Sequence, residues 1–165
     1  MKVSVLEVAL LFLFLLCGQG NCLGQKNDVE DRVVDSAIQF RFARPTNQLA
    51  KIKAFYMDGL GLEELGSFTG HSGYSGVMLG LPHSEYHLEF TAHEEQEPLP
   101  KPSKENLLVL YFESEEKYEA ANRRLQAYGV QPVEPENPDW KGKSQTYEDP
   151  DKWRVVLLNG VYKPK

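Results

Sequence analysis

The sequence predicts an α+β protein in which two βαβββ modules follow one another along the chain. Three observations support this prediction. Short segments in which apolar and polar residues alternate are typical of strands. Each half of the chain also has one segment with apolar residues at helical spacing. A polar, proline-rich stretch at residues 94–105 lies between the halves and has the composition of a linker.

The composition is that of a globular protein with an acidic charge balance. The chain has 165 residues, 41% of them hydrophobic, and 18 Lys+Arg against 24 Asp+Glu give a formal net charge of -6. This length allows one domain, or two small modules that share a core. The acidic balance argues against a nucleic-acid partner, because nucleic-acid binders present a basic face.

The N-terminal segment has the layout of a secretory signal peptide, which we place at residues 1–24. Lys2 precedes an apolar run at residues 8–16, and small residues follow it at Gly18, Gly20 and Gly24. The run is shorter than the roughly 20 residues that span a bilayer. We therefore expect cleavage, no stable membrane span afterwards, and a secreted or secretory-lumen protein. The alternatives are an uncleaved anchor and a misassigned start codon.

The remaining chain divides into a polar spacer at residues 25–36 and a domain at residues 37–160. The first module, residues 37–93, begins with an alternating strand at 37–43. A helix with apolar residues from Leu49 to Tyr56 follows, with Thr46 or Asn47 as its N-cap and Gly59 at its end. Three further strands are predicted, at residues 62–68, 77–81 and 86–91.

The second module, residues 106–160, repeats this order. A buried strand at 107–112 precedes a helix for which Ser114 is the N-cap and Gly129 the stop. Strands are predicted to start at residue 130, to pass through 145–147 and to occupy 153–159. An ordinary α+β domain without duplication is the alternative. We favour duplication because both halves close with a proline turn, an aromatic residue and an alternating strand.

Several segments resemble the vicinal oxygen chelate superfamily, which includes glyoxalase I, extradiol dioxygenases, fosfomycin-modifying enzymes and bleomycin-binding proteins. The segments are FYMDGLGLEELGSF, YHLEFT and EDPDKWRVVLLN, while IQFRFARPTNQ and GYSGVMLGLP are similar to a YycE-like subgroup. The resemblance covers residues 37–160 and implies that the two modules form a cupped mixed sheet. It is compatible with a monomer or a homodimer, since modules of this fold pair within one chain or between two.

The resemblance also implies where metal ligands would lie, namely on the first and last strand of each module. There a metal would chelate two neighbouring substrate oxygens. The corresponding positions are Arg41, Glu89, approximately Asn106, and Val156. Only Glu89 is an ordinary ligand, and Arg41 carries a fixed positive charge. The metal site is therefore expected to be incomplete and no cofactor is assured. A relocated divalent metal on His87 and Glu89, with His71 or His93, is the alternative.

Strand alternation extends this set of residues. If Arg41 and Glu89 face the cup, the same face is expected to hold Thr91, Val156, Leu158, Leu108 and Leu110 as well as the candidate ligand-binding residues. These candidates are Gln39, Arg41, His87, Glu89 and Arg154. Arg41 and Glu89 form either a structural salt bridge or part of an anion-binding pocket with Arg154. For Arg154 the alternative is a solvated surface arginine.

Other chemistries find no support, because G-x-S-x-G, Walker, CxxC and HExxH motifs are all absent. We expect a glyoxalase- and bleomycin-resistance-like protein that binds a small organic molecule in its β cup. The alternatives are a metal-dependent lyase or dioxygenase of the glyoxalase type with an altered metal site, and a scaffold that acts through protein contacts. Whether the protein is an enzyme stays open at this point.

Overall fold

The computed structural model describes residues 38–82 and 84–164. The predicted signal peptide and polar spacer lie outside the described residues, so cleavage and secretion stay predictions. Within the described ranges no helix is both long and apolar enough to cross a membrane.

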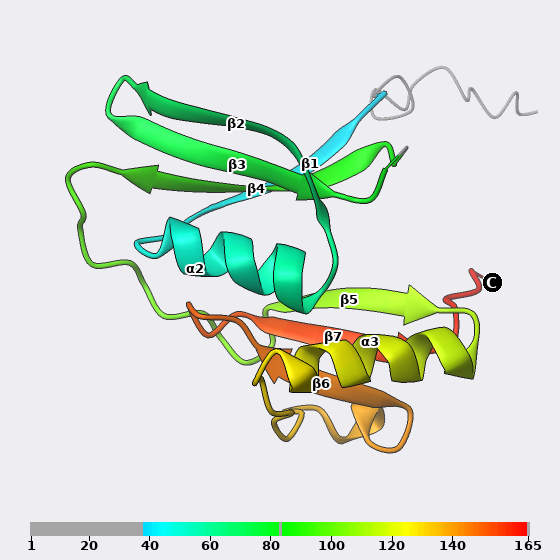
Figure 1. The fold of residues 1–165 in the computed structure, drawn as a ribbon. Helices are drawn as coiled ribbons and strands as arrows, with labels where there is room; N and C mark the ends of the chain where they lie inside the picture. The colour runs from blue at the N-terminus through cyan, green and yellow to red at the C-terminus, as the bar shows by residue number, and fades with distance from the viewer. Residues whose placement is uncertain (1–37, 83, 165) are drawn as a thin grey trace, which may run out of the picture. The chain divides into compact units, whose positions relative to one another are not determined.

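Module one has the predicted βαβββ order, as Figure 1 shows. In its four-stranded sheet the strands lie in the order β1-β4-β3-β2, with β1 and β4 parallel and the other neighbours antiparallel. Helix α2 packs against β3 and β4 and continues into the π-helical turn η3. The elements are β1 (Phe40–Pro45), α2 (Leu49–Ala54), η3 (Phe55–Gly59), β2 (Glu63–His71), β3 (Tyr74–Gly80) and β4 (Tyr86–His93).

Module two repeats this topology except for one strand. Its sheet has the order β5-β7-β6, and β5 is parallel to β7 just as β1 is to β4. Helix α3 packs on β5 and β7. The predicted fold class is therefore confirmed, although the two modules hydrogen-bond as two separate sheets. The elements are β5 (Leu107–Phe112), α3 (Glu115–Ala127), the 3-10 turn η4 (Pro138–Trp140), β6 (Ser144–Glu148) and β7 (Arg154–Asn159).

The strand predicted to start at residue 130 is not formed. Only Val133 pairs with the sheet, through a single bridge to Thr146, with the Val133 N–H donating to the Thr146 carbonyl at 2.7 Å. The next N–H in that direction that would point to β6 belongs to residue 135, which is a proline and has no N–H to donate, so the ladder does not continue there. The bridge nevertheless occupies the place that β2 takes in module one.

The helix boundaries agree in part with the predictions. Ser114 is the N-cap of α3, and its Oγ accepts the Lys117 N–H at 3.3 Å. Gly129 follows α3 with φ +96, a conformation that favours glycine. For α2 the N-cap is Gln48, so the prediction of Thr46 or Asn47 is wrong. The Thr46 Oγ1 instead accepts the Gln48 N–H at 2.9 Å and closes a turn before the helix.

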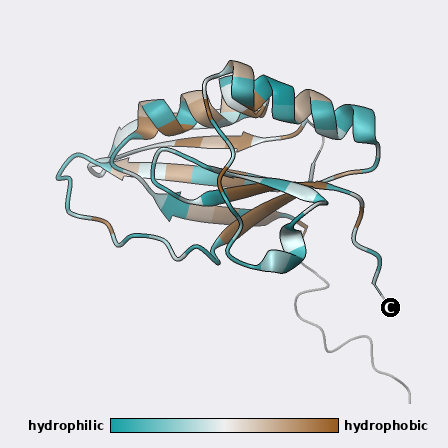
Figure 2. Ribbon diagram, turned by 90° about the horizontal axis from the view of Figure 1, so that it is seen from below, coloured by the Kyte–Doolittle hydropathy of each residue, from teal (hydrophilic) through white to brown (hydrophobic). Residues whose placement is uncertain are grey.

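One continuous hydrophobic cluster joins the two modules. It contains Phe55 and Phe90 from module one and Leu125, Tyr147 and Leu157 from module two. In Figure 2 hydrophobic residues gather in the strands and on parts of the helices, while the loops are mostly hydrophilic. Each fully buried side chain of this kind contributes roughly 1.5 to 3 kcal/mol. The shared core therefore holds the two modules against each other.

The strand register corrects one prediction about side-chain faces. Leu107 pairs with Arg154, whereas Leu108 pairs with Val155 and Leu110 with Leu157. Parallel partners point to the same side of a sheet. Leu108 and Leu110 therefore lie on the core side with Leu157, and not on the face of Arg154 as predicted.

Candidate functional site

Three of the predicted site residues lie together on module one. The Arg41 Nε donates to His87 Nε2 at 2.9 Å, and the Arg41 Nη1 donates to Glu89 Oε2 at 2.5 Å. We call this group the Arg41 triad. Its members come from the neighbouring strands β1 and β4, where Arg41 is the register partner of His87. His87 and Glu89 are buried, while the Arg41 side chain is 52% exposed.

The other two predicted residues are Gln39 and Arg154, and of these Arg154 lines the same cavity as His87. Gln39 is exposed and directly precedes β1. Arg154 is only 4% exposed, so the interpretation as a solvated surface arginine is wrong. Its Nη1 donates to the Glu134 carbonyl at 3.2 Å, and its Nη2 lies 3.7 Å from Glu148. Its buried Nε has no hydrogen-bond partner.

The Arg41 triad does not fit a divalent metal ion. The donor atoms His87 Nε2 and Glu89 Oε2 both accept N–H groups of Arg41. No group of three His, Cys, Asp or Glu side chains in the described part of the chain is placed to hold an ion. His71 is exposed at the end of β2, and His93 Nδ1 accepts the Glu95 N–H at 3.1 Å.

A cavity of about 230 Å³ lies between the two modules. We call it the inter-module cavity. Phe40, Phe42 and Arg44 line it from β1, and they lie on the side of that strand opposite to Arg41. The cavity is therefore formed mainly by the other face of β1 and β4, although His87 of the Arg41 triad also contributes to its lining. Aromatic and leucine side chains dominate its lining, including Phe40, Phe42, Tyr86, Leu108, Leu110 and Trp153.

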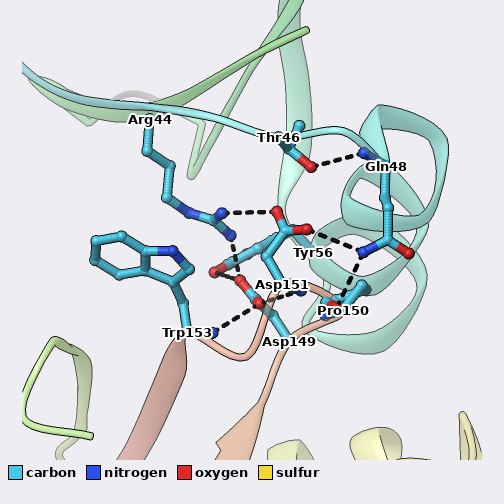
Figure 3. A network of polar contacts seen from close by, with 8 residues as sticks. All are labelled: Arg44, Thr46, Gln48, Tyr56, Asp149, Pro150, Asp151 and Trp153. Atoms are coloured by element: carbon cyan, nitrogen blue, oxygen red, sulfur yellow. Dashed lines mark hydrogen bonds and ion pairs between the residues drawn. The ribbon is translucent and has the colours of Figure 1, made fainter. Parts of the chain in front are cut away.

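A buried ionic network, which we call the Arg44 network, forms part of the cavity wall (Figure 3). Arg44 is 5% exposed. Its Nη2 pairs with Asp149, and its Nη1 donates to Asp151 Oδ2 at 2.9 Å. The guanidinium also lies 4.8 Å from the ring centroid of Phe90 and 5.1 Å from that of Trp153. Arg44 thereby ties β1 to the turn before β7.

Further hydrogen bonds complete the Arg44 network. Asp149 Oδ1 accepts the N–H groups of Asp151 at 2.8 Å and Trp153 at 3.0 Å. The Tyr56 hydroxyl donates to Asp149 Oδ2 at 3.0 Å. Gln48 Nε2 donates to Asp151 Oδ1 at 3.0 Å (Figure 3). Buried charges require such saturation of their lone pairs, because each unpaired group would carry its full desolvation cost.

Burial shifts the acidity of two groups in this network. It raises the pKa of the Tyr56 phenol far above its ordinary value, and the charge of Asp149 raises it further while Arg44 lowers it. Burial also raises the pKa of the Asp149 carboxyl, and the charge of Arg44 acts in the opposite direction. Outside the network, burial raises the pKa values of Tyr118 and Tyr147.

The Arg44 network could not be predicted from the sequence. The sequence pattern predicts only the end of a strand after Ala43 and a turn at residues 148–151. The partners are 105 residues apart in the chain. The one local signal is the turn itself, in which Asp149 and Asp151 flank Pro150 immediately before a strand. That pattern predicts the turn but does not indicate that Arg44 binds its carboxylates.

Together, the βαβββ order of module one, the βαββ order of module two and their strand orders define a glyoxalase-like fold of the vicinal oxygen chelate class. Two family models match the chain, the YycE-like N-terminal domain over residues 40–91 and the YycE-like C-terminal domain over residues 105–159. The uncharacterised protein YycE of Bacillus subtilis (strain 168) is 48% identical over 123 residues, which are 74% of this chain and 88% of that protein. The chain therefore belongs to the YycE-like family.

Solved structures agree with this assignment. The crystal structure of a YycE protein of unknown function from Bacillus subtilis matches with a TM-score of 0.73 and 46% identity, covering 77% of this chain and 93% of that one. TnmS3, an antibiotic binding protein from Streptomyces sp. CB03234, matches with a TM-score of 0.56 and 24% identity over 76% of this chain and 97% of its own. The second likeness shows the fold alone.

A fosfomycin resistance protein, FosX from Listeria monocytogenes, shares the fold as well. Its TM-score is 0.57 at 19% identity, and the match covers 73% of this chain and 90% of that one. That protein was crystallised as a mutant with Mn(II) and a dihydroxypropylphosphonic acid. The fold therefore accommodates a divalent metal in a protein whose sequence is distant from this one.

The Arg44 network predicts a large effect of Asp149→Asn on stability. We expect the free energy of unfolding at neutral pH to fall by about 3 to 5 kcal/mol, because the buried Arg44 guanidinium loses its most buried counter-charge. Urea unfolding measures this change. The matched control is Glu113→Gln, which removes an exposed ion pair to Lys117 and should leave the stability nearly unchanged. Equal stability of the two variants would contradict the prediction.

The raised pKa of Tyr56 predicts a loss of stability in alkali. Above about pH 10 the unfolded chain releases the Tyr56 proton, whereas the folded chain retains it. The unfolded state then binds fewer protons, so the free energy of unfolding falls as pH rises, by about 1.4 kcal/mol per pH unit for this group. We expect Tyr56→Phe to show a correspondingly shallower slope in urea unfolding between about pH 10 and 11.

Tyr162→Phe is the control for this alkaline slope, because Tyr162 is 74% exposed. It should keep the slope of the parent. At neutral pH, Tyr56→Phe should be less stable than the parent by about 1 kcal/mol, since Asp149 loses one hydrogen bond. The two effects are separable because only the first depends on pH. Parallel alkaline slopes for Tyr56→Phe and the parent would refute the assignment.

Proposed function

We propose that this protein binds a compact and largely apolar organic molecule in the inter-module cavity. The observation that carries this proposal is the cavity itself, about 230 Å³ in volume and lined almost entirely by aromatic and aliphatic side chains. Binding sites for small molecules are concave, mostly apolar and supplied with a few polar groups. The cavity is small among such sites, which favours a compact ligand.

The mouth of the cavity supports this function. Phe40 is 69% exposed, and Phe42 and Tyr86 are each nearly half exposed, although all three line the cavity. Large aromatic side chains contribute the most favourable free energy of burial when their surface is removed from water. A contiguous set of exposed aromatic residues around a cavity is typical of a ligand-binding site. A ligand with an aromatic or aliphatic body would cover this surface.

Arg154 offers the polar contact. It also lines the cavity, and its buried Nε has no hydrogen-bond partner. A buried donor without a partner costs about 1 to 3 kcal/mol. A carbonyl or carboxylate oxygen of the ligand at this nitrogen would remove that cost. The proposed ligand therefore combines an apolar body with one acceptor oxygen.

The antibiotic-binding relative TnmS3 supports small-molecule binding by this fold, though only as an analogy of architecture. A metal-dependent lyase or dioxygenase is less well supported, because Arg41 engages the donor atoms of His87 and Glu89. Gln39, the remaining predicted residue of the cup face, is exposed and lies outside the cavity lining. We therefore propose that the ligand binds in the inter-module cavity, and not on the face that carries the Arg41 triad.

Filling the cavity tests the proposal. A panel of small aromatic acids and ketones is screened against the protein by thermal shift, and hits are titrated by calorimetry. We expect at least one hit to bind the parent, and Leu108→Trp to bind it at least about tenfold more weakly, because the indole takes up cavity space. Leu99→Trp, in the linker, is the matched control and should bind like the parent.

A second variant tests the polar contact. Arg154→Met keeps much of the side-chain volume but removes the donor, so it should weaken acids and ketones while leaving hydrocarbon analogues unchanged. A panel without a single hit on the parent would contradict the proposal. So would a folded Leu108→Trp variant that binds with parental affinity.

A further inference from the structure

We propose that Arg41 takes the place of a divalent metal ion on the face of module one that carries the Arg41 triad. Its guanidinium bridges two side chains that are both good metal ligands, His87 and Glu89, with distances of 2.9 and 2.5 Å. One planar cation thus satisfies an imidazole nitrogen and a carboxylate oxygen at the same time. The inference does not depend on the proposed ligand of the inter-module cavity, because it is argued from the contacts of Arg41 with His87 and Glu89, of which only His87 also lines that cavity.

The donor atoms explain why Arg41 and a metal ion exclude each other. A metal ion needs the unprotonated lone pairs of His87 Nε2 and Glu89 Oε2. In the folded chain these atoms accept the N–H groups of Arg41. Because Nε2 of His87 is an acceptor, the hydrogen-bond network assigns the ring proton to Nδ1. An entering ion would have to displace the guanidinium, and the like charges would then repel each other.

Burial explains why some cation is needed at this position. Glu89 is 8% exposed and His87 is 6% exposed, so the carboxylate has little contact with water. A buried carboxylate needs a positive partner. Arg41 cannot lose its charge under any ordinary condition. The triad therefore neutralises Glu89 permanently, without any dependence on metal supply.

The neighbouring strand gives the face no further hard ligand. Met78 on β3 is the register partner of Glu89, and its thioether is a soft donor that suits copper better than magnesium or manganese. Without Arg41 the face would thus hold two good ligands and a net negative charge. One more nitrogen or oxygen donor at position 41 would complete a set of three, the number found in catalytic zinc sites.

Arg41→Ala alone cannot test this proposal, because it removes the cation without adding a ligand. Arg41→His does both, and position 41 is the register partner of His87 on the same face. The matched control is Arg123→His, which adds a histidine to an exposed position of α3. Zinc and manganese binding are measured by calorimetry and by elemental analysis of the dialysed chains, with folding checked by circular dichroism.

We expect Arg41→His to bind one zinc ion per chain at least about tenfold more tightly than the parent and Arg123→His. Adding Glu89→Gln to Arg41→His should abolish this gain, because the carboxylate ligand is lost. A folded Arg41→His variant that binds zinc no better than Arg123→His would overturn the proposal. A parent chain that binds one divalent ion, and loses it in His87→Ala, would overturn it as well.

The parent chain provides a test that needs no variant to fold. Long-range ¹H–¹⁵N spectra of the histidine rings should show His87 Nε2 unprotonated and its proton on Nδ1. Addition of one equivalent of zinc should leave these signals in place, because the guanidinium already engages Nε2. A zinc-induced shift of the His87 ring signals, or a ring proton on Nε2, would refute the placement of Arg41 as the resident cation.

Discussion

The position of the two modules relative to each other depends on the buried guanidinium of Arg44. This side chain leaves β1, is removed from water, and finds both of its carboxylate partners, Asp149 and Asp151, in the turn before β7. A buried charge is tolerated only when its partners are in place, so the turn has to dock where it does. Phe90 and Trp153 stack on the same guanidinium and also line the inter-module cavity. The network that joins the modules therefore also shapes the cavity.

Most of the fold could be predicted from the sequence because it is encoded locally. Alternation of apolar residues located the strands, and the β5 prediction agrees with the observed Leu107–Phe112. Two features could not be obtained in this way. The sides of Leu108 and Leu110 depend on the register of β5 against β7, which no single strand encodes. The strand predicted to start at residue 130 is not formed beyond Val133 because Pro135 removes the next ladder donor, a constraint that outweighs apolar patterning.

In the candidate sites as well, the features encoded within one strand could be predicted and those that depend on distant segments could not. The closeness of His87 and Glu89 follows from their spacing of two along one strand. The resemblance implied ligand positions at Arg41 and Glu89, and the structure pairs the two strands that carry them. The burial of Arg154 could not be predicted from its own strand. It arises from contacts with segments of module two that have little strand signal, including Glu134. The inter-module cavity was the feature least accessible to prediction from the sequence. It is created by packing between residues as distant as Phe40 and Trp153, and such packing has no local signature in a sequence.

Strand β1 links these features, because its two arginines point to opposite sides of the sheet. Arg44 and Arg41 are three residues apart, so alternation places one toward the module junction and the other on the far face. Each neutralises buried carboxylate, Asp149 in one case and Glu89 in the other. A single short strand thereby supplies fixed cations to both sides of the sheet. Neutralisation of Glu89 by Arg41 does not require an ion on that face. Because another protein of this fold holds Mn(II), function has to be argued from the side chains and not from the fold.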